Sequence, residues 1–350
     1  MKRHKKELIL VGFLFLVLLF SVLEYSITEN LATQQLAKRW SKEEIYTQLA
    51  CYFTEDGSFT KEQILAVERS LITGMEEASI TAEKENGGRN WLDAYSTQGE
   101  LVIASNRAVL TVRAFGVGGD FFKFHPLTLL DGTYFDNTDF NEDGVVIDEV
   151  TAWQLFGSNH VAGMEVEING TVYPIRGVVR SDNGLFSEAV KEEEATIYVS
   201  FGILEGEEML PIDCYEVLIA NPVEGFGKET FINALDMEED EYEIIECSTR
   251  YDLANQWDVI QNFGVRSMTT KNIVFPYWEN RARGYEDVSA LLLVMQIICL
   301  VYPVWWLLKN GYSFWKNRKE VKKKFWENLK NKYTLLKNKK KTDKVNKEKA

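Results

Sequence analysis

The segment DFNEDGVVIDEV, residues 139–150, has side chains at the spacing of a calcium-binding loop. Asp139, Asn141 and Asp143 stand at positions 1, 3 and 5 of the EF-hand pattern, where oxygen ligands are required. Gly144 stands at position 6, where the pattern requires a sharp turn. The first half of the segment therefore has the chemistry of a calcium site.

The second half of the segment argues against calcium. Position 12 should be a glutamate that binds through both oxygens, but it is Val150, and Glu149 comes one place early. Residues 145–147 favour a strand where an EF-hand continues into a helix. We interpret the segment as a turn whose acidic side chains accept nearby backbone N–H bonds, and a weak calcium site is the alternative. The turn-forming acids are Asp136, Asp139 and Asp143.

No other set of side chains predicts catalysis. The three histidines have no neighbours at metal-ligand spacing, and no serine or cysteine is identified with a partner base. The phosphate-binding pattern G-x-x-x-x-G-K-[S/T] does not occur in the sequence. We therefore expect a protein that is not an enzyme, with no catalytic residue, no metal and no cofactor. Cys214 and Cys247 could form a disulfide or stay as buried thiols, and their spacing leaves both open.

Charge is segregated along the chain, whose overall net charge is −14. Residues 1–6 carry four lysines and arginines and no acid, and residues 309–350 carry 16 against four acids. Residues 7–308 hold 49 acids and 19 bases. Two basic ends around an acidic middle are typical of a membrane protein and not of a soluble enzyme.

Two apolar segments lie at these charge boundaries. The first can extend from residue 8 to 27, about the length that crosses a bilayer, and a cleaved signal peptide is the alternative. The second has 21 residues without a charge. Positive flanking residues belong in the cytoplasm. We therefore predict a cytoplasmic N-terminus (1–7), a membrane helix (8–27), an extracytoplasmic domain (28–287), a second membrane helix (288–308) and a cytoplasmic tail (309–350).

Aromatic residues stand near both ends of the second apolar segment, where amphipathic rings favour the headgroup level. We predict membrane-interface positions for Tyr277, Trp278, Tyr302, Trp305 and Trp306. Residues 272–287, just before this segment, are either a rigid stalk that transmits motion or a plain interfacial anchor.

Strand and helix patterns alternate in the acidic middle. A strand at 48–53 precedes a helix that starts at Thr60, where Gln63 completes a capping box. Strands follow at 100–105 and 108–118. Near the end, strands at 196–201 and 214–221 precede a helix at 227–236 and a strand at 241–247. Two β-α-β halves around a central insert predict an α+β fold.

The central insert spans about residues 122–180. A helix is expected at 148–157, with Gly157 as its stop. Residues 164–179 predict a hairpin, because Asn169–Gly170 suits a turn in which both central residues need positive φ.

Residues 116–179 resemble the periplasmic core domain of MacB-type ABC transporter permeases. The matching marks run from Asp120–Phe122 through Pro126 and Leu130 to the strand at 145–149 and the strand pair that ends at Gly177–Val178. The motif residues to which we assign a structural role are Gly132, Phe135, Ala152, Phe156, Gly157, Gly163 and Gly177. The first apolar segment and the outer region agree with the layout of that family.

The resemblance implies a porter-like subdomain built from both flanks and an inserted mixed α/β subdomain. It also implies an outer domain that shifts when partner ATPase subunits dimerise. The family permease has three membrane helices after this domain, whereas this sequence offers one. We therefore expect half of a split permease or an accessory subunit, with an ABC ATPase and a multi-helix permease as partners and a homo- or hetero-dimer as a further option. The alternative is an anchored binding module for a peptide or cell-wall ligand.

The tail has apolar residues every three, four or seven positions between lysines, which indicates a basic amphipathic helix. We expect it to lie on anionic inner-leaflet lipids, with docking to a cytoplasmic partner as the alternative. Nucleic-acid binding is not expected.

Overall fold

The computed structural model describes residues 2–29, 31–41, 45–54, 57–80, 89–136, 143–181, 186, 194–206, 210–263 and 272–347. The chain forms two compact units. We call Glu24–Leu291 the outer domain, and the second unit consists of Met1–Leu23 with Leu292–Ala350.

The outer domain is built on one ten-stranded sheet with the order β10-β1-β9-β2-β3-β8-β5-β7-β4, and β6 pairs with β2 and β7. Most of its strands are rich in β-branched or aromatic residues that fit a pleated surface. The strands are β1 (Tyr46–Phe53), β2 (Trp91–Ala104), β3 (Val109–Gly119), β4 (Leu129–Gly132), β5 (Val145–Asp148), β6 (Glu165–Ile168), β7 (Thr171–Val179), β8 (Thr196–Ser200), β9 (Cys214–Ala220) and β10 (Tyr242–Glu246).

The β10-β1-β9-β2 part of the sheet interleaves two β-α-β units. The first is β1, α3 (Lys61–Glu77) and β2, and the second is β9, α7 (Phe226–Leu235) and β10. Strand β1 lies antiparallel between β9 and β10, and β9 lies antiparallel to β2. This is a split β-α-β arrangement of the ferredoxin-like kind. The two β-α-β halves predicted from the sequence are therefore confirmed as elements, and they share one sheet.

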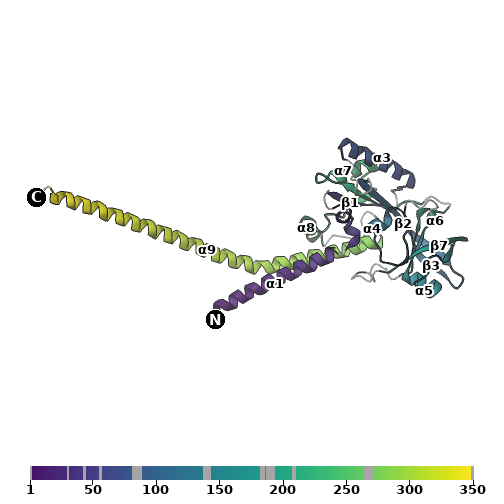
Figure 1. Ribbon diagram of the computed structural model, residues 1–350, viewed down its shortest axis with the longest axis horizontal. Helices are drawn as coiled ribbons and strands as arrows, with labels where there is room; N and C mark the ends of the chain where they lie inside the picture. Colours follow the sequence, from purple (N-terminus) through teal and green to yellow (C-terminus); the bar gives the residue numbers. More distant parts are fainter. Residues whose placement is uncertain are drawn as a thin grey trace. The chain divides into compact units, whose positions relative to one another are not determined.

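Helices α3 and α7 lie together on one face of this sheet (Figure 1). Their apolar residues, among them Leu71 and Phe231, are fully buried against Leu49 and Tyr215 of the strands. Helix α3 begins at the predicted capping box, where the Thr60 backbone N–H donates to Gln63 Oε1 at 2.8 Å. The residues buried between these two helices and the sheet form the first hydrophobic core of the outer domain.

Residues 122–180, the expected insert, contribute four strands and α5 (Glu149–Phe156) to the same sheet. Helix α5 packs its buried Ala152 and Leu155 on β5, β7 and β8 and ends at Gly157, whose φ of 73° is left-handed. The predicted hairpin turn is confirmed, since Asn169 and Gly170 have φ of 50° and 80°. These elements form a second core at the far part of the sheet.

The face of the sheet opposite α3 and α7 is covered by short elements and by the start of the longest helix. The elements on this face are η1 (Ala32–Gln34), α2 (Leu36–Trp40), α4 (Phe121–Phe124) and the start of α9 (Tyr277–Lys347). Helix α6 (Phe201–Glu205) adjoins β2, β3 and β8. Helix α8 (Leu253–Asn262) lines a pocket together with β10. Trp278 and Ala282 of α9 are buried here. Phe115, Phe121 and Tyr198 surround Trp278 in a core rich in aromatic rings.

Among the described residues, two helices are long and apolar enough to cross a membrane by length and composition. They are residues Lys6–Glu29 of α1 (Lys2–Glu29) and Tyr277–Tyr312 of α9. Within the second unit, the rings of Phe13 and Tyr302 lie 5.5 Å apart. Pro303 lies inside α9.

Candidate functional site

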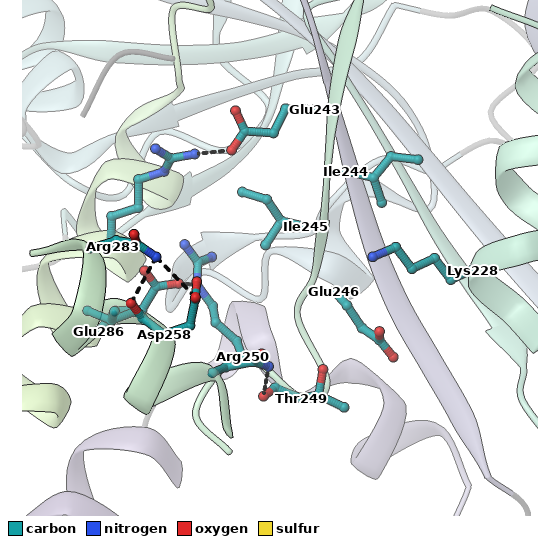
Figure 2. Close-up of a pocket in the computed structure, with 13 residues that line it drawn as sticks. Lys228, Glu243, Ile244, Ile245, Glu246, Thr249, Arg250, Asp258, Arg283 and Glu286 are labelled. Atoms are coloured by element: carbon teal, nitrogen blue, oxygen red, sulfur yellow. Dashed lines mark hydrogen bonds and ion pairs between the residues drawn. The ribbon is translucent and has the colours of Figure 1, made fainter. Parts of the chain in front are cut away.

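Five charged side chains converge where α9 enters the core of the outer domain. The residues are Arg250, just before α8, Glu243 on β10, and Glu279, Arg283 and Glu286 on α9. Glu279, Arg283 and Glu286 follow one another at intervals of four and three residues, so they share one face of the helix. We call this group the α9 charge cluster, and Figure 2 shows several of its members.

Arg250 and Glu279 form the centre of the α9 charge cluster. Arg250 Nη2 donates to Glu279 Oε1 at 2.6 Å, and Nη1 donates to Oε2 at 2.7 Å. This two-pronged geometry matches the planar guanidinium to the carboxylate. Arg250 is 4% exposed and Glu279 is 0% exposed. A buried charge of this kind is tolerated only because it is paired and hydrogen-bonded.

The remaining members extend the pairing. Arg283 Nε donates to Glu279 Oε1 at 2.8 Å, and Arg283 Nη2 donates to Glu243 Oε1 at 2.8 Å. Arg250 Nε donates to Glu286. The network therefore joins two turns of α9 to the edge of the sheet and to the segment before α8.

Neutral groups complete the hydrogen bonding around the central pair. Tyr52 on β1 donates its hydroxyl to Glu279 Oε2 at 3.2 Å, and Arg250 Nη1 donates to Gln34 Oε1 at 3.2 Å. Tyr251 donates to the carbonyl of Ala282 on α9 at 3.1 Å. The start of α9 is thus held from β1, η1 and the loop after β10.

The electrostatics keep the central pair charged. Burial alone would raise the pKa of Glu279, but Arg250 and Arg283 outweigh it and lower that pKa. Burial would lower the pKa of Arg250, but the charge of Glu279 outweighs it and raises that pKa. The pKa of Tyr52 is raised by its burial and by Glu279. Glu279 and Arg250 therefore both stay charged in the buried pair.

The outer end of α1 is held nearby by hydrogen bonds inside the outer domain. Glu24 Oε1 accepts from Gln256 Nε2 on α8 at 2.6 Å and from Ser289 Oγ on α9 at 3.3 Å. Helix α8 therefore contacts both helices whose remaining residues belong to the second unit.

The predicted interface aromatics lie in different surroundings. Trp278 is 2% exposed and packs on the ring of His125 with centroids 4.5 Å apart, and Tyr277 donates to or accepts from the Tyr198 hydroxyl at 2.7 Å. Trp278 is buried where α9 starts inside the outer domain, and the membrane-interface positions of these aromatic residues stay a prediction. In the second unit, Trp305 is 53% exposed and has the Lys309 ammonium 4.9 Å from its ring.

The motif residues shape turns and cores around the second half of the sheet. A Cβ on Gly132, whose φ is 73°, would meet the carbonyl oxygen of Arg176 at 2.1 Å, so only glycine fits there. The side chains of Phe135, Ala152 and Phe156 are buried. Gly157 caps α5. Gly163 lies just before β6, and Gly177 lies in β7.

The acidic turn is only partly described, because Asp139 and Asn141 lie outside the described residues. Asp143 accepts from Arg176 Nη2 at 2.7 Å, and the Gly144 N–H donates to Ser200 Oγ at 3.2 Å. Within the described part of the chain, no group of three or more histidine, cysteine or acidic side chains could hold a metal ion. The preference for a turn over a weak calcium site stays a prediction.

The four cysteines are buried free thiols. Cys214 and Cys247 share one apolar cluster, and the structure contains no bond between them. Burial raises the pKa of both thiols, which disfavours the reactive thiolate. Of the two options left open by the sequence, the structure has the buried thiols.

The α9 charge cluster was only partly visible in the sequence. In the segment ENRARGYED, the spacing of Glu279, Arg283 and Glu286 by four and three residues is the available signal, because it places all three on one helix face. Arg250 gave no signal, because it stands in a turn about 30 residues before its partner and depends on the fold to approach Glu279.

Comparisons with known proteins place the chain in a family. The sequence model described as MacB-like periplasmic core domain matches residues 9–220. No curated protein matches the chain. The chain is similar to the extracellular domain of the noncanonic ABC-type transporter YknZ from Gram-positive bacteria, with 16% identity, a TM-score of 0.40 and coverage of 57% of this chain and 99% of that one.

A second similar structure is the periplasmic region of MacB from Actinobacillus actinomycetemcomitans. It has 14% identity, a TM-score of 0.42 and coverage of 63% of this chain and 94% of that one. The family model covers more than half of the 350 residues, including residues 9–27 of the first apolar segment and the strands from β1 to β9. The chain therefore belongs to the family of proteins with a MacB-like periplasmic core domain.

Proposed function

We propose that the protein is a non-catalytic membrane subunit of an ABC-type transport or mechanotransmission complex. Its outer domain would lie on the extracytoplasmic side and respond to a partner permease and ATPase. Family membership and the two apolar helices support this role. The single observation that carries it is the α9 charge cluster, because it fixes the outer domain to a helix that also belongs to the second unit.

The cluster suits the transmission of movement. The first turns of α9 carry buried Trp278, Ala282 and Glu279, so a displacement of the helix would disturb a packed aromatic core and a buried ion pair. Packed interiors resist gradual deformation and respond as rigid bodies. Movement of the helix would therefore shift the outer domain as a whole. Of the two earlier readings of residues 272–287, we propose the rigid stalk.

The outer end of α1 gives a second attachment. The Glu24 hydrogen bonds to α8 and α9 would make both membrane helices act on the same part of the outer domain. The basic residues outside the apolar segments would lie in the cytoplasm, and the lysine-rich tail would rest on anionic lipids.

The test is purification of the full chain in mild detergent from its native cells. We expect an ATPase and a multi-helix permease to accompany it. In that complex, a non-hydrolysed ATP analogue should change hydrogen exchange in residues 245–263, which include Arg250 and α8. The variant Glu279→Gln should retain the partners and lose this change. The proposal would be refuted if the chain purified alone from native membranes. It would also be refuted if the ATP analogue left hydrogen exchange in residues 245–263 unchanged.

A further inference from the structure

Strand β10 is the outermost strand at one end of the sheet. Its strand neighbour is β1, with Cys51 opposite Ile244 and Leu49 opposite Glu246. An edge strand presents a row of backbone N–H and C=O groups that another extended chain can pair with. Among the described residues, no strand occupies the other side of β10.

The hydrogen bonds at the two ends of this pairing show which backbone groups face outward. The Thr54 N–H donates to the Glu241 carbonyl at 2.9 Å, and the Cys247 N–H donates to the Gln48 carbonyl at 2.8 Å. Residues in an antiparallel pair alternate between facing the partner and facing away. Glu243 and Ile245 therefore face β1, and the backbone groups of Ile244 and Glu246 face away from it.

A groove of about 530 Å³ runs along this outward edge. Its floor is β10 from Glu243 to Glu246, and α8 contributes Asn255, Asp258, Val259 and Asn262. Figure 2 shows the β10 side chains alternating: Ile244 and Glu246 point toward Lys228 of α7, and Glu243 and Ile245 point toward α9. Each side of the strand therefore presents one acidic and one apolar side chain.

The charges of the groove favour a basic occupant. The side chains that line the groove include four acids and three bases, so its lining has a net negative charge: Glu243, Glu246, Asp258 and Glu286 against Lys228, Arg250 and Arg283. The surrounding residues 7–308 are strongly acidic, with 49 acids to 19 bases. A second copy of the chain would place the glutamates of one β10 beside those of the other, and facing like charges oppose such pairing.

We propose that the groove along β10 binds an extended basic peptide, which adds a strand to the sheet through hydrogen bonds to the backbone of Ile244 and Glu246. Peptides bound in this mode gain affinity from main-chain bonds and specificity from alternate side chains. Because each side of β10 presents one acidic and one apolar side chain, a complementary strand would carry one basic and one apolar side chain on each of its faces. A repeat of two basic and two apolar residues meets that requirement, because residues two apart share a face. This binding site does not rest on the coupling role.

The test uses the full chain in nanodiscs of neutral lipid and a fluorescein-labelled peptide of sequence KKVVKKVV. Fluorescence anisotropy should show binding at least tenfold tighter than that of EEVVEEVV. The sequence KVKVKVKV, with every lysine on one face, should bind several-fold more weakly than KKVVKKVV. Hydrogen exchange should slow in residues 242–247 on binding, since the outward amides of β10 become bonded.

Two controls separate strand addition from general attraction of charge. A KKVVKKVV peptide with methylated backbone nitrogens keeps its charge and cannot donate, so it should lose at least tenfold in affinity. Asp258→Lys in the groove should weaken binding several-fold, and Glu100→Lys on β2 makes the same charge change away from the groove and should not. Equal affinity of the methylated peptide, slowed exchange outside β10, or no binding of KKVVKKVV would each overturn the proposal.

Discussion

At the scale of single residues, Glu279 is a charged side chain buried in the outer domain. Its carboxylate is completely buried and accepts hydrogen bonds from Arg250, Arg283 and Tyr52. Such a pair adds little to stability compared with apolar residues of the same size, yet removing one partner leaves an uncompensated buried charge. The value of the network is therefore best tested by breaking it in steps.

We predict that Glu279→Leu lowers the free energy of unfolding by about 3–5 kcal/mol, because Arg250 and Arg283 lose their shared partner. The double variant with Arg250→Met should lose less than the two single changes added together, since the groups are coupled. Chemical unfolding of the full chain in detergent measures both. Exposed Glu224→Ala is the control and should stay within about 0.5 kcal/mol. Additive losses would contradict direct coupling.

Asp93 predicts a dependence of stability on pH. Burial, followed by the charge of Glu68, raises its pKa from 3.8 to about 7, and Tyr215 donates to it at 3.1 Å. The folded state therefore binds a proton that the unfolded state has lost, so this contribution to stability is present below pH 3.8 and is lost as pH rises toward 7.

We predict that Asp93→Asn removes this loss and keeps an acceptor for Tyr215. Between pH 4 and 7 the free energy of unfolding of the natural protein should fall relative to the variant by up to about 1.4 kcal/mol per pH unit. Thermal unfolding in a series of buffers measures the difference. A constant difference across that range would show that Asp93 does not titrate there.

At the scale of elements, local sequence signals predicted the structure well where one turn or cap decides it. The helix start at Thr60, the stop at Gly157 and the Asn169–Gly170 turn all occur where they were expected. The order of the strands was not predictable, because β10 pairs with β1 across about 190 residues. Strand β2 also begins at Trp91, nine residues before its expected start, and the early part pairs with β9.

Separation along the sequence also decides which residues of the candidate site could be predicted. Glu279, Arg283 and Glu286 could be placed on one helix face from spacing alone, whereas Arg250 could not be assigned to them without the fold. Trp278 was expected at the membrane surface because aromatic residues near an apolar segment favour headgroups. In the structure its ring is buried in the core of the outer domain, and the sequence pattern gave no signal for that packing.

Helix α3 gives a prediction at the same scale. Thr60→Ala should lower the free energy of unfolding by about 1 kcal/mol, because the capping box at the start of the helix loses one of its side chains. Thr60→Ser retains a hydroxyl and should be close to the natural protein. Denaturant unfolding distinguishes the two. Equal losses in both variants would point to packing of the threonine methyl group instead.

At the scale of the whole molecule, the proposed orientation makes opposite predictions for the two charged regions. Protease added outside intact cells should cut within the acidic middle, since residues 28–287 are expected outside the membrane. A tag placed after the lysine-rich tail should stay uncut until the membrane is permeabilised. Immunoblots for the tag and for the outer domain measure both. Loss of the tag in intact cells would reverse the assigned orientation.

The buried thiols give the molecule a practical property. Cys51, Cys214 and Cys247 lie in the core of the outer domain, and Cys299 is 8% exposed in the second unit. A maleimide dye added to the native fold should therefore react slowly with all four. One cysteine introduced at an exposed site such as Val223 would then carry nearly all the dye, so probes of movement can be attached without first rebuilding the interior.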